Sequence, residues 1–344
     1  MRFSLKTSPQ NPLKTLVAPM LLSVTLLGCG NGSDVARDEY GDPIETDAPF
    51  VAVTQIVEHP ALDAVRDGLQ DKLKEEGYDE ADNSLKWVWE SAQGQAATAT
   101  QIAQKFVGDN PDLIVAIATP SAQAVVGKAD TIPVVFSAVT DPVEAELVSN
   151  LASPGGTVTG VSDLSPINEH LGLISQIVPN AETIGVIYNA GESNSVSLVK
   201  LIYTEAEKRG LLVEDATVST SAEVTTAAES LVGKVDAIYV PTDNTVVSAL
   251  ESVIKVGDDN DIPIFAGDTD SVERGAIATA SFDYYEVGRQ TGDMVARILD
   301  GENPGDIPVE LAKTVDLAIN LKAAETMGVK VPDTIKNSAD QVFE

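Results

Sequence analysis

The sequence predicts an α/β fold: two doubly wound parallel-sheet lobes joined by a hinge that the chain crosses several times. Three observations indicate it. Short, nearly continuous apolar runs alternate with amphipathic helical segments, as in parallel sheets covered by helices. The same order of segments occurs twice along the chain. The part of the 344-residue chain that follows its N-terminal region, about 300 residues, is more than one hydrophobic core normally serves.

The first 28 residues have the pattern of a secretory signal peptide. Basic residues without acidic ones precede an apolar run over 16–27, which is too short to span a bilayer comfortably. Gly28 then precedes Cys29, and LLGC resembles the lipobox of bacterial lipoproteins, in which the cysteine is lipidated and becomes the first residue. We expect lipidation of Cys29; the alternative is a buried structural thiol. As the chain has no other cysteine, we expect no internal disulfide.

The segment 29–48 is polar, acidic and rich in turn-forming residues, so we expect a flexible tether, with folding beginning near Phe50. The whole chain has 53 acidic and 22 basic residues. Such a surface repels phosphate backbones and anionic headgroups, which excludes nucleic acid as a partner.

The first lobe is expected to begin with a strand over 50–55 and a helix in which Leu62, Val65, Leu69 and Leu73 share one face. Gly77 would close this helix. Further strands and helices are expected in alternation, at 85–90, 95–107, 112–118, 121–127, 132–138 and 157–162.

The second lobe is expected to repeat this order from Thr183. A strand over 183–189 leads into a helix that closes at Gly210, and Thr183 and Gly210 both lie 133 positions beyond Phe50 and Gly77. The strands expected at 236–240 and 262–265 are the counterparts of those at 112–118 and 132–138. Several matches in the same order favour two similar lobes.

The remaining segments, 276–301 and 315–329, are too short for a third lobe and are expected to supply one further strand and helix to each. The expected division is a signal peptide, a tether and two discontinuous lobes: 1–28, 29–48, 49–161 plus 282–304, and 162–281 plus 305–344. Two lobes joined by several crossings form a cleft that can close on a small molecule.

Ligands of open α/β sheets bind beyond the carboxyl ends of the strands, near helix N-termini. The candidates at these positions are Gln55, His59, Thr119, Pro120, Ser121, Thr140, Asp141, Asn189, Glu192, Asn194, Ser195, Thr242, Asp243, Asn244 and Asp268. None is Arg or Lys, which disfavours a phosphate or dicarboxylate ligand and favours a zwitterion.

In this hypothesis Thr119, Ser121 and Ser195 receive the carboxylate. Asp141, Asp243 or Asp268 receives the ammonium group. The alternative for each position is an ordinary helix N-cap, which contributes about 1 kcal/mol without touching a ligand. Asn194 and Ser195 follow a longer loop, which favours their reaching into the cleft.

The aromatic and histidine residues give a weaker signal. Trp87 and Trp89 share one face of a strand and are typical of core packing, whereas Tyr284 and Tyr285 follow a chain crossing and could line the hinge. With only His59 and His170 and no catalytic, Walker or dinucleotide motif, we expect no enzyme, no metal site and no cofactor.

Several motifs together resemble one family. TQIVEHPALDAVRDG, ATPSAQA, AVTDPV, GVSD, PTDN and MGVKVP, spread from about residue 50 to 335, are similar to ABC-transporter substrate-binding proteins of the TrpX-like group. The resemblance implies a type I periplasmic-binding fold and delivery of a solute, an aromatic amino acid in this group, to a permease and its ATPase. We also expect a monomer, exported and lipid-anchored in the cell envelope. A ligand-sensing module for a membrane signalling receptor is the alternative.

Overall fold

The computed structural model describes residues 48–313 and 315–344, which belong to one compact unit. The expected signal peptide, Cys29 and the expected tether up to residue 47 lie outside the described residues. Within those described, no helix has the length and apolar character needed to cross a membrane.

The first lobe is built on a six-stranded parallel sheet. Its strand order is β11 (Glu310–Leu311), β5 (Val158–Ser162), β4 (Val134–Val139), β3 (Leu113–Ile117), β1 (Phe50–Gln55) and β2 (Lys86–Ser91). Because the chain moves from β1 outward to β2 and then back past β1 to β3, the order reverses between β1 and β3. Such a reversal opens a crevice at the carboxyl ends of the two strands.

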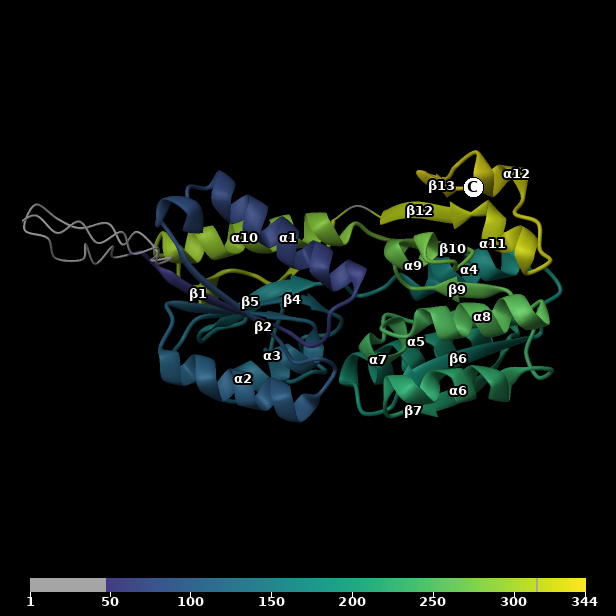
Figure 1. Cartoon of the computed structure of the whole chain (residues 1–344), viewed down its shortest axis with the longest axis horizontal. Helices are drawn as coiled ribbons and strands as arrows, with labels where there is room; N and C mark the ends of the chain where they lie inside the picture. The colour runs from purple at the N-terminus through teal and green to yellow at the C-terminus, as the bar shows by residue number, and fades with distance from the viewer. Residues whose placement is uncertain (1–47, 314) are drawn as a thin grey trace, which may run out of the picture. The chain divides into compact units, whose positions relative to one another are not determined.

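Helices cover both faces of this sheet, and two of them come from distant parts of the sequence (Figure 1). The helices are α1 (Pro60–Glu75) and α10 (Tyr284–Leu299) on one face, and α2 (Ala96–Asp109) and α3 (Thr119–Val126) on the other. The expected apolar face of α1 is buried, and Gly77 follows the helix with φ of 91°. A left-handed conformation of this kind favours glycine.

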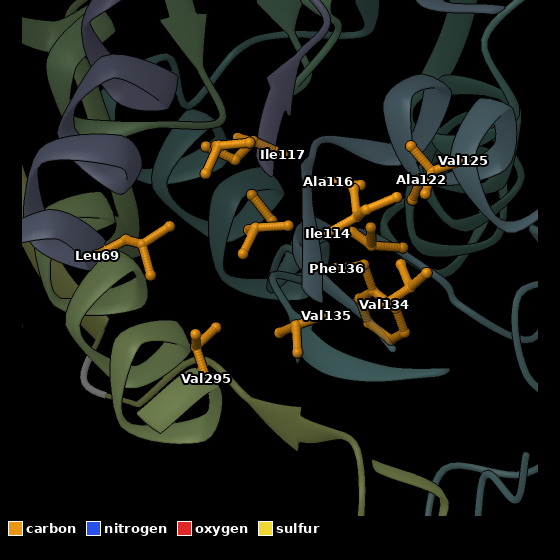
Figure 2. Close-up of a cluster of buried hydrophobic side chains, with 14 of the residues drawn as sticks. Leu69, Ile114, Ala116, Ile117, Ala122, Val125, Val134, Val135, Phe136 and Val295 are labelled. Atoms are coloured by element: carbon orange, nitrogen blue, oxygen red, sulfur yellow. The ribbon is translucent and has the colours of Figure 1, made fainter. Parts of the chain in front are cut away.

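The core of the first lobe lies on both sides of the sheet (Figure 2). Ile117 and Val135 point toward Leu69 of α1 and Val295 of α10. Alternate strand residues, including Ala116 and Phe136, point the other way, toward Ala122 and Val125 of α3. Side chains alternate in this way along any strand, so a strand that is covered on both faces is apolar throughout.

The second lobe has a four-stranded parallel sheet with the order β7 (Leu212–Val218), β6 (Thr183–Asn189), β8 (Ala237–Val240) and β9 (Ile264–Ala266). This order corresponds to β2-β1-β3-β4 of the first lobe, so the predicted internal repeat is present in the topology. The helices of this lobe are α4 (Ile167–Ile177), α5 (Ser193–Arg209), α6 (Val224–Leu231), α7 (Asn244–Val247), α8 (Leu250–Asn260), α9 (Thr269–Glu273), α11 (Leu321–Thr326) and α12 (Asp333–Lys336).

The C-terminal segments differ from the expectation in two respects. β10 (Ala278–Phe282) pairs with β12 (Val315–Asn320) in an antiparallel arrangement, and β13 (Gln341–Phe343) completes a separate three-stranded sheet in the second lobe. The segment β11 pairs with β5 of the first sheet, so the expected assignment of all residues from 305 to 344 to the second lobe is wrong for β11. The chain passes between the lobes after β5, after β10 and after β11.

Candidate functional site

A cavity of about 360 Å³ lies where the carboxyl ends of the strands of both lobes meet. Its apolar lining comes from Ala61, Leu62, Ala118, Ala138 and Val247. Its polar lining comes from His59, Thr119, Thr140, Asp163, Asn194, Thr242, Asp243, Asn244, Asp268 and Tyr284.

The N-terminus of α3 forms one wall of this cavity. The residue before the helix, Ala118, has φ of 72°, a conformation that costs a non-glycine residue about 1–3 kcal/mol. No side chain caps the helix. The hydroxyls of Thr119, which is 1% exposed, and of Ser121 have no hydrogen-bond partner among the described residues. This wall therefore presents donors that no other part of the described chain uses.

Asp163 also lines this cavity and is only 3% exposed. The Tyr284 hydroxyl donates to Asp163 Oδ2 over 2.8 Å. Asp163 Oδ1 has no partner among the described residues. Burial raises the pKa of Asp163 to about 6. Both residues belong to segments where the chain passes between lobes, so the carboxylate lies near the hinge.

Asn194, in the first turn of α5, contributes an acceptor from the second lobe. Its Nδ2 donates to Glu192 Oε2 over 3.3 Å, to the Ser195 hydroxyl over 3.3 Å and to the Thr242 carbonyl over 3.2 Å. Because these acceptors fix which end of the amide is the NH₂ group, Oδ1 is an acceptor. It is buried without a partner among the described residues.

Asp243 is fully buried and lines the cavity, but protein donors occupy both of its oxygens. Oδ2 accepts from the Asn189 N–H and the Ser195 hydroxyl, both over 2.6 Å. Oδ1 accepts from the Val246 N–H over 2.8 Å, as an N-cap of α7. Burial, together with the neighbouring Glu192, raises the pKa of Asp243 to about 7. Asp243 therefore orders the second-lobe wall.

Asp268 has a similar arrangement one strand further along. Its Oδ1 accepts from the Ser271 N–H over 2.8 Å and its Oδ2 from the Ser271 hydroxyl over 2.6 Å. Burial raises the pKa of this carboxyl.

His59 caps α1, and burial lowers the pKa of its imidazole to about 4, so the ring is neutral near pH 7.

The structure brings about half of the predicted site residues into the cavity lining: His59, Thr119, Thr140, Asn194, Thr242, Asp243, Asn244 and Asp268. The remaining predicted residues do not line it: Gln55, Pro120, Ser121, Asp141, Asn189, Glu192 and Ser195. Gln55 donates to Val57 O and Asp63 Oδ1, and Asp141 caps its own turn through the N–H groups of Val143 and Glu144. Glu192 accepts from Asn244 and Thr245 at the start of α7.

The predicted list omitted Asp163 and Tyr284. Asp163 follows β5, where the chain leaves the lobe without entering a helix at once, so the search for strand-to-helix turns did not select it. Asp163 belongs to the motif GVSD. Tyr284 was expected only at the hinge.

Trp87 and Trp89 pack against the core and line no part of this cavity. Among residues 48–313 and 315–344 no cluster of side chains is suited to hold a metal ion.

The comparison with known families decides the identity. The family model for ABC transporter substrate-binding proteins matches residues 50–343. The chain belongs to this family. The resemblance deduced from the motifs is therefore confirmed, and the family is one of non-catalytic receptors that work with an ABC transporter.

This substrate-binding protein is 40% identical over 331 residues to the tyrosine-binding protein of Clostridioides difficile, covering 96% of this chain and 94% of that protein. A solved structure, the ABC domain in complex with L-Trp from Streptococcus pneumonia, is 37% identical with a TM-score of 0.83, covering 86% of this chain and 100% of that one. A ligand-free, open substrate-binding protein with adhesive properties from Clostridium difficile is 39% identical with a TM-score of 0.65, covering 86% and 99%. These matches confirm the predicted fold class.

Proposed function

We propose that this substrate-binding protein captures an aromatic L-amino acid in the cavity between its lobes and delivers it to the permease of an ABC importer. One observation carries the proposal: the cavity lining combines a buried, unused donor, the Thr119 hydroxyl, with two buried, unused acceptors, Asp163 Oδ1 and Asn194 Oδ1. A free amino acid has the complementary groups, a carboxylate and an ammonium. The named ligands of the two relatives above, tyrosine and L-Trp, support an aromatic side chain.

In this proposal the carboxylate is received at the N-terminus of α3. The Thr119 hydroxyl has no partner among the described residues, no side chain caps α3, and a helix N-terminus favours negative charge. Ser121 supports this end from within the helix. The donors are neutral, which suits a zwitterion better than a ligand of net negative charge.

The ammonium group is received by Asp163 Oδ1 and Asn194 Oδ1. One oxygen comes from the hinge region of the first lobe and the other from α5 of the second lobe. A ligand that contacts both lobes stabilises the arrangement in which they are close together. The higher TM-score against the L-Trp complex than against the ligand-free, open relative, at nearly equal identity, supports describing this arrangement as closed.

Assignment of Asp163 changes the hypothesis drawn from the sequence. Asp243 and Asp268 are saturated by protein donors, and Asp141 is outside the lining. Asp243 and Asp268 could accept the ammonium group only if the ligand displaced one of their internal hydrogen bonds. Asp163 needs no such displacement, because one of its oxygens is free of protein partners.

The test is a thermal-unfolding screen of the purified protein against single L-amino acids, sugars and nucleosides, followed by calorimetric titration of each hit. A true ligand stabilises the protein by about 2.7 kcal/mol at a concentration of 100 times its Kd. We expect L-tyrosine or L-tryptophan to give the largest rise in Tm. A rise with sugars or nucleosides, and none with amino acids, would refute the proposal.

We further propose that lipid on Cys29 holds a monomeric receptor at the extracytoplasmic face of a membrane, with no nucleic-acid partner. The lipobox-like LLGC and the acidic composition support this. Cys29→Ala should move the protein from the membrane fraction to the supernatant without changing ligand affinity. Retention of that variant in membranes would contradict the anchor.

A further inference from the structure

Two buried carboxylates, Glu192 and Asp243, support the second-lobe wall of the ligand cavity. Glu192 is 7% exposed, and Asp243 is fully buried. Glu192 Oε1 accepts from the N–H and the hydroxyl of Thr245, over 3.0 and 2.7 Å. Glu192 Oε2 accepts from the N–H and Nδ2 of Asn244, over 3.2 and 2.5 Å. Because Asp243 already caps α7, a second buried carboxylate at the start of this short helix indicates a role beyond capping it.

Both carboxylates act on the side-chain amide of Asn194. Glu192 Oε2 accepts from Asn194 Nδ2 directly, over 3.3 Å. Asp243 acts through Ser195, whose hydroxyl donates its single hydrogen to Asp243 Oδ2 over 2.6 Å. The Ser195 oxygen is therefore left only to accept, and it does so from Asn194 Nδ2 over 3.3 Å. With the Thr242 carbonyl at 3.2 Å as the third acceptor, the NH₂ group is held on the protein, and Oδ1 is the end that remains for a ligand.

The cavity therefore meets the amino group of a ligand with acceptors only. These are Asn194 Oδ1 and Asp163 Oδ1, both buried without a partner among the described residues. An ammonium group has three hydrogens to donate, a hydroxyl has one, and a keto oxygen has none. A keto acid would thus bring a third acceptor against two buried ones and leave both unpaired, which disfavours its binding.

We infer that Glu192 is a positioning residue that makes this receptor select an α-amino acid against the α-keto and α-hydroxy acids with the same side chain. The inference rests on the proposed function, because it uses Asn194 and Asp163 as the ammonium acceptors. Glu192 does not line the cavity. It acts by holding the Asn194 amide in the orientation that accepts, and Asp243 assists it through Ser195.

The first measurement is calorimetric titration of the unmodified protein with L-tyrosine and with its α-keto and α-hydroxy analogues. Titration at pH 8 keeps Asp243 mainly ionised, since burial and the neighbouring Glu192 raise its pKa to about 7. We expect the α-keto analogue to bind at least about 100-fold, and the α-hydroxy analogue at least about tenfold, more weakly than L-tyrosine. Equal binding of the three would overturn the inference.

Glu192→Gln tests the positioning role. The oxygen of the new amide should face Thr245, whose backbone N–H has a fixed direction. The new NH₂ group should then face the side-chain amides of Asn244 and Asn194, which can rotate. An Asn194 amide that turns presents its NH₂ group to the ligand. We expect L-tyrosine to bind at least about tenfold more weakly and the α-keto analogue no more weakly than before, so the ratio of the two affinities narrows at least about tenfold.

The matched control is Asp236→Asn. This carboxylate also accepts from backbone N–H groups, those of Glu182 and Thr183, and it does not line the cavity. The control should leave both affinities unchanged. A purely structural effect of Glu192→Gln would weaken all three ligands by the same factor, whereas a loss of positioning changes the ratio between them.

Ser195→Ala provides a second variant with a smaller change in the wall. It removes one of the three acceptors of Asn194 Nδ2 and should narrow the same ratio by about twofold to fivefold. An unchanged ratio in both Glu192→Gln and Ser195→Ala would overturn the inference and leave amino-acid binding by the unmodified protein intact. Failure of the unmodified protein to bind L-tyrosine or L-tryptophan would instead refute the proposed function, and the inference with it.

Discussion

Asp163, Thr119 and Asn194 each keep a buried polar atom without a protein partner at the same cavity. Leaving such an atom unsatisfied costs about 1–3 kcal/mol, so three at one place are expensive for the fold. The strained backbone of Ala118 adds to this cost. A ligand that supplies the missing partners recovers the cost on binding. The ligand site is therefore indicated most strongly by single residues: by the strained backbone of Ala118 and by these three unsatisfied polar atoms.

The first prediction concerns the carboxylate of Asp163. Asp163→Asn should weaken binding of the aromatic amino acid by about 10-fold to 150-fold, because hydrogen bonds to charged groups are worth about 1.5–3 kcal/mol. The variant should still fold, since the amide can accept from Tyr284. Calorimetric titration measures the affinity, and Asp141→Asn, outside the lining, is the control. Equal affinities of the two variants would rule out Asp163 as the ammonium acceptor.

The pH dependence of binding tests the same carboxylate. Its pKa is raised to about 6 in the free protein by burial, and the ligand amino group stays protonated below pH 7. Below pH 6 a proton competes with the ammonium group, so the affinity should fall by up to tenfold per pH unit, and it should level off above pH 7. Titrations at several pH values measure this. Asp163→Asn should remove the drop between pH 5 and 6.5, and an unchanged drop in that variant would contradict the assignment.

Sequence reasoning selected many residues that line this cavity, but it did not predict which of them already have partners within the protein. Ser, Thr, Asp and Asn after a strand are expected both at helix N-caps and at ligand sites. Asp243 and Asp268 proved to cap α7 and α9, while Thr119 leads an uncapped helix. The sequence cannot distinguish these cases, because they depend on which donors occupy each side chain, and for Asp243 these include the distant Asn189 and Ser195.

At the scale of elements, α1 and α10 pack closely although more than 200 residues separate them in sequence. Glycines make this approach possible: a Cβ on Gly288 would lie 2.1 Å from Val65 O, and one on Gly68 would lie 2.1 Å from Tyr285 O. The helical pattern of each segment was readable from its sequence. Their contact was not, because a glycine in a helix does not indicate which helix it faces.

Gly288→Ala should destabilise the protein through this contact. The added methyl group must push the two helix backbones apart, and overpacking of this kind costs about 1–3 kcal/mol. Chemical denaturation would show a lower midpoint. The matched control is Gly172→Ala in α4, where a Cβ meets nothing within 4 Å and where alanine favours the helix by about 1 kcal/mol. A midpoint for Gly288→Ala equal to or above that of the control would contradict the close packing.

At the scale of the whole molecule, the internal repeat predicted two similar sheets because the same apolar order occurs twice. The C-terminal part followed no repeat, and its strands were placed less well: β10 pairs antiparallel to β12, and β11 joins the first sheet. Such pairings depend on where the chain returns after each crossing. The local pattern of a strand predicts its burial but not its neighbour.

Closure of the lobes should depend on Glu144, which follows β4 in the first lobe. Glu144 Oε2 accepts from the Ser197 hydroxyl over 3.0 Å and from Lys200 Nζ over 2.9 Å, both on α5 of the second lobe. Among the described residues this is the one ion pair that joins elements of different lobes. Lys200 lowers the pKa of Glu144, so the pair stays charged through the neutral range.

Because this contact exists only when the lobes are close together, Glu144→Gln should favour the open form without altering the cavity. We expect ligand affinity to fall by about twofold to fivefold, mainly through faster dissociation, since exposed ion pairs contribute little. Stopped-flow measurement of dissociation at low and high salt tests this. High salt should speed dissociation from the unmodified protein and have less effect on Glu144→Gln. Lys255→Gln, which removes an exposed ion pair within α8, is the control, and an equal salt response in all three proteins would show that the Glu144 contact has no role in closure.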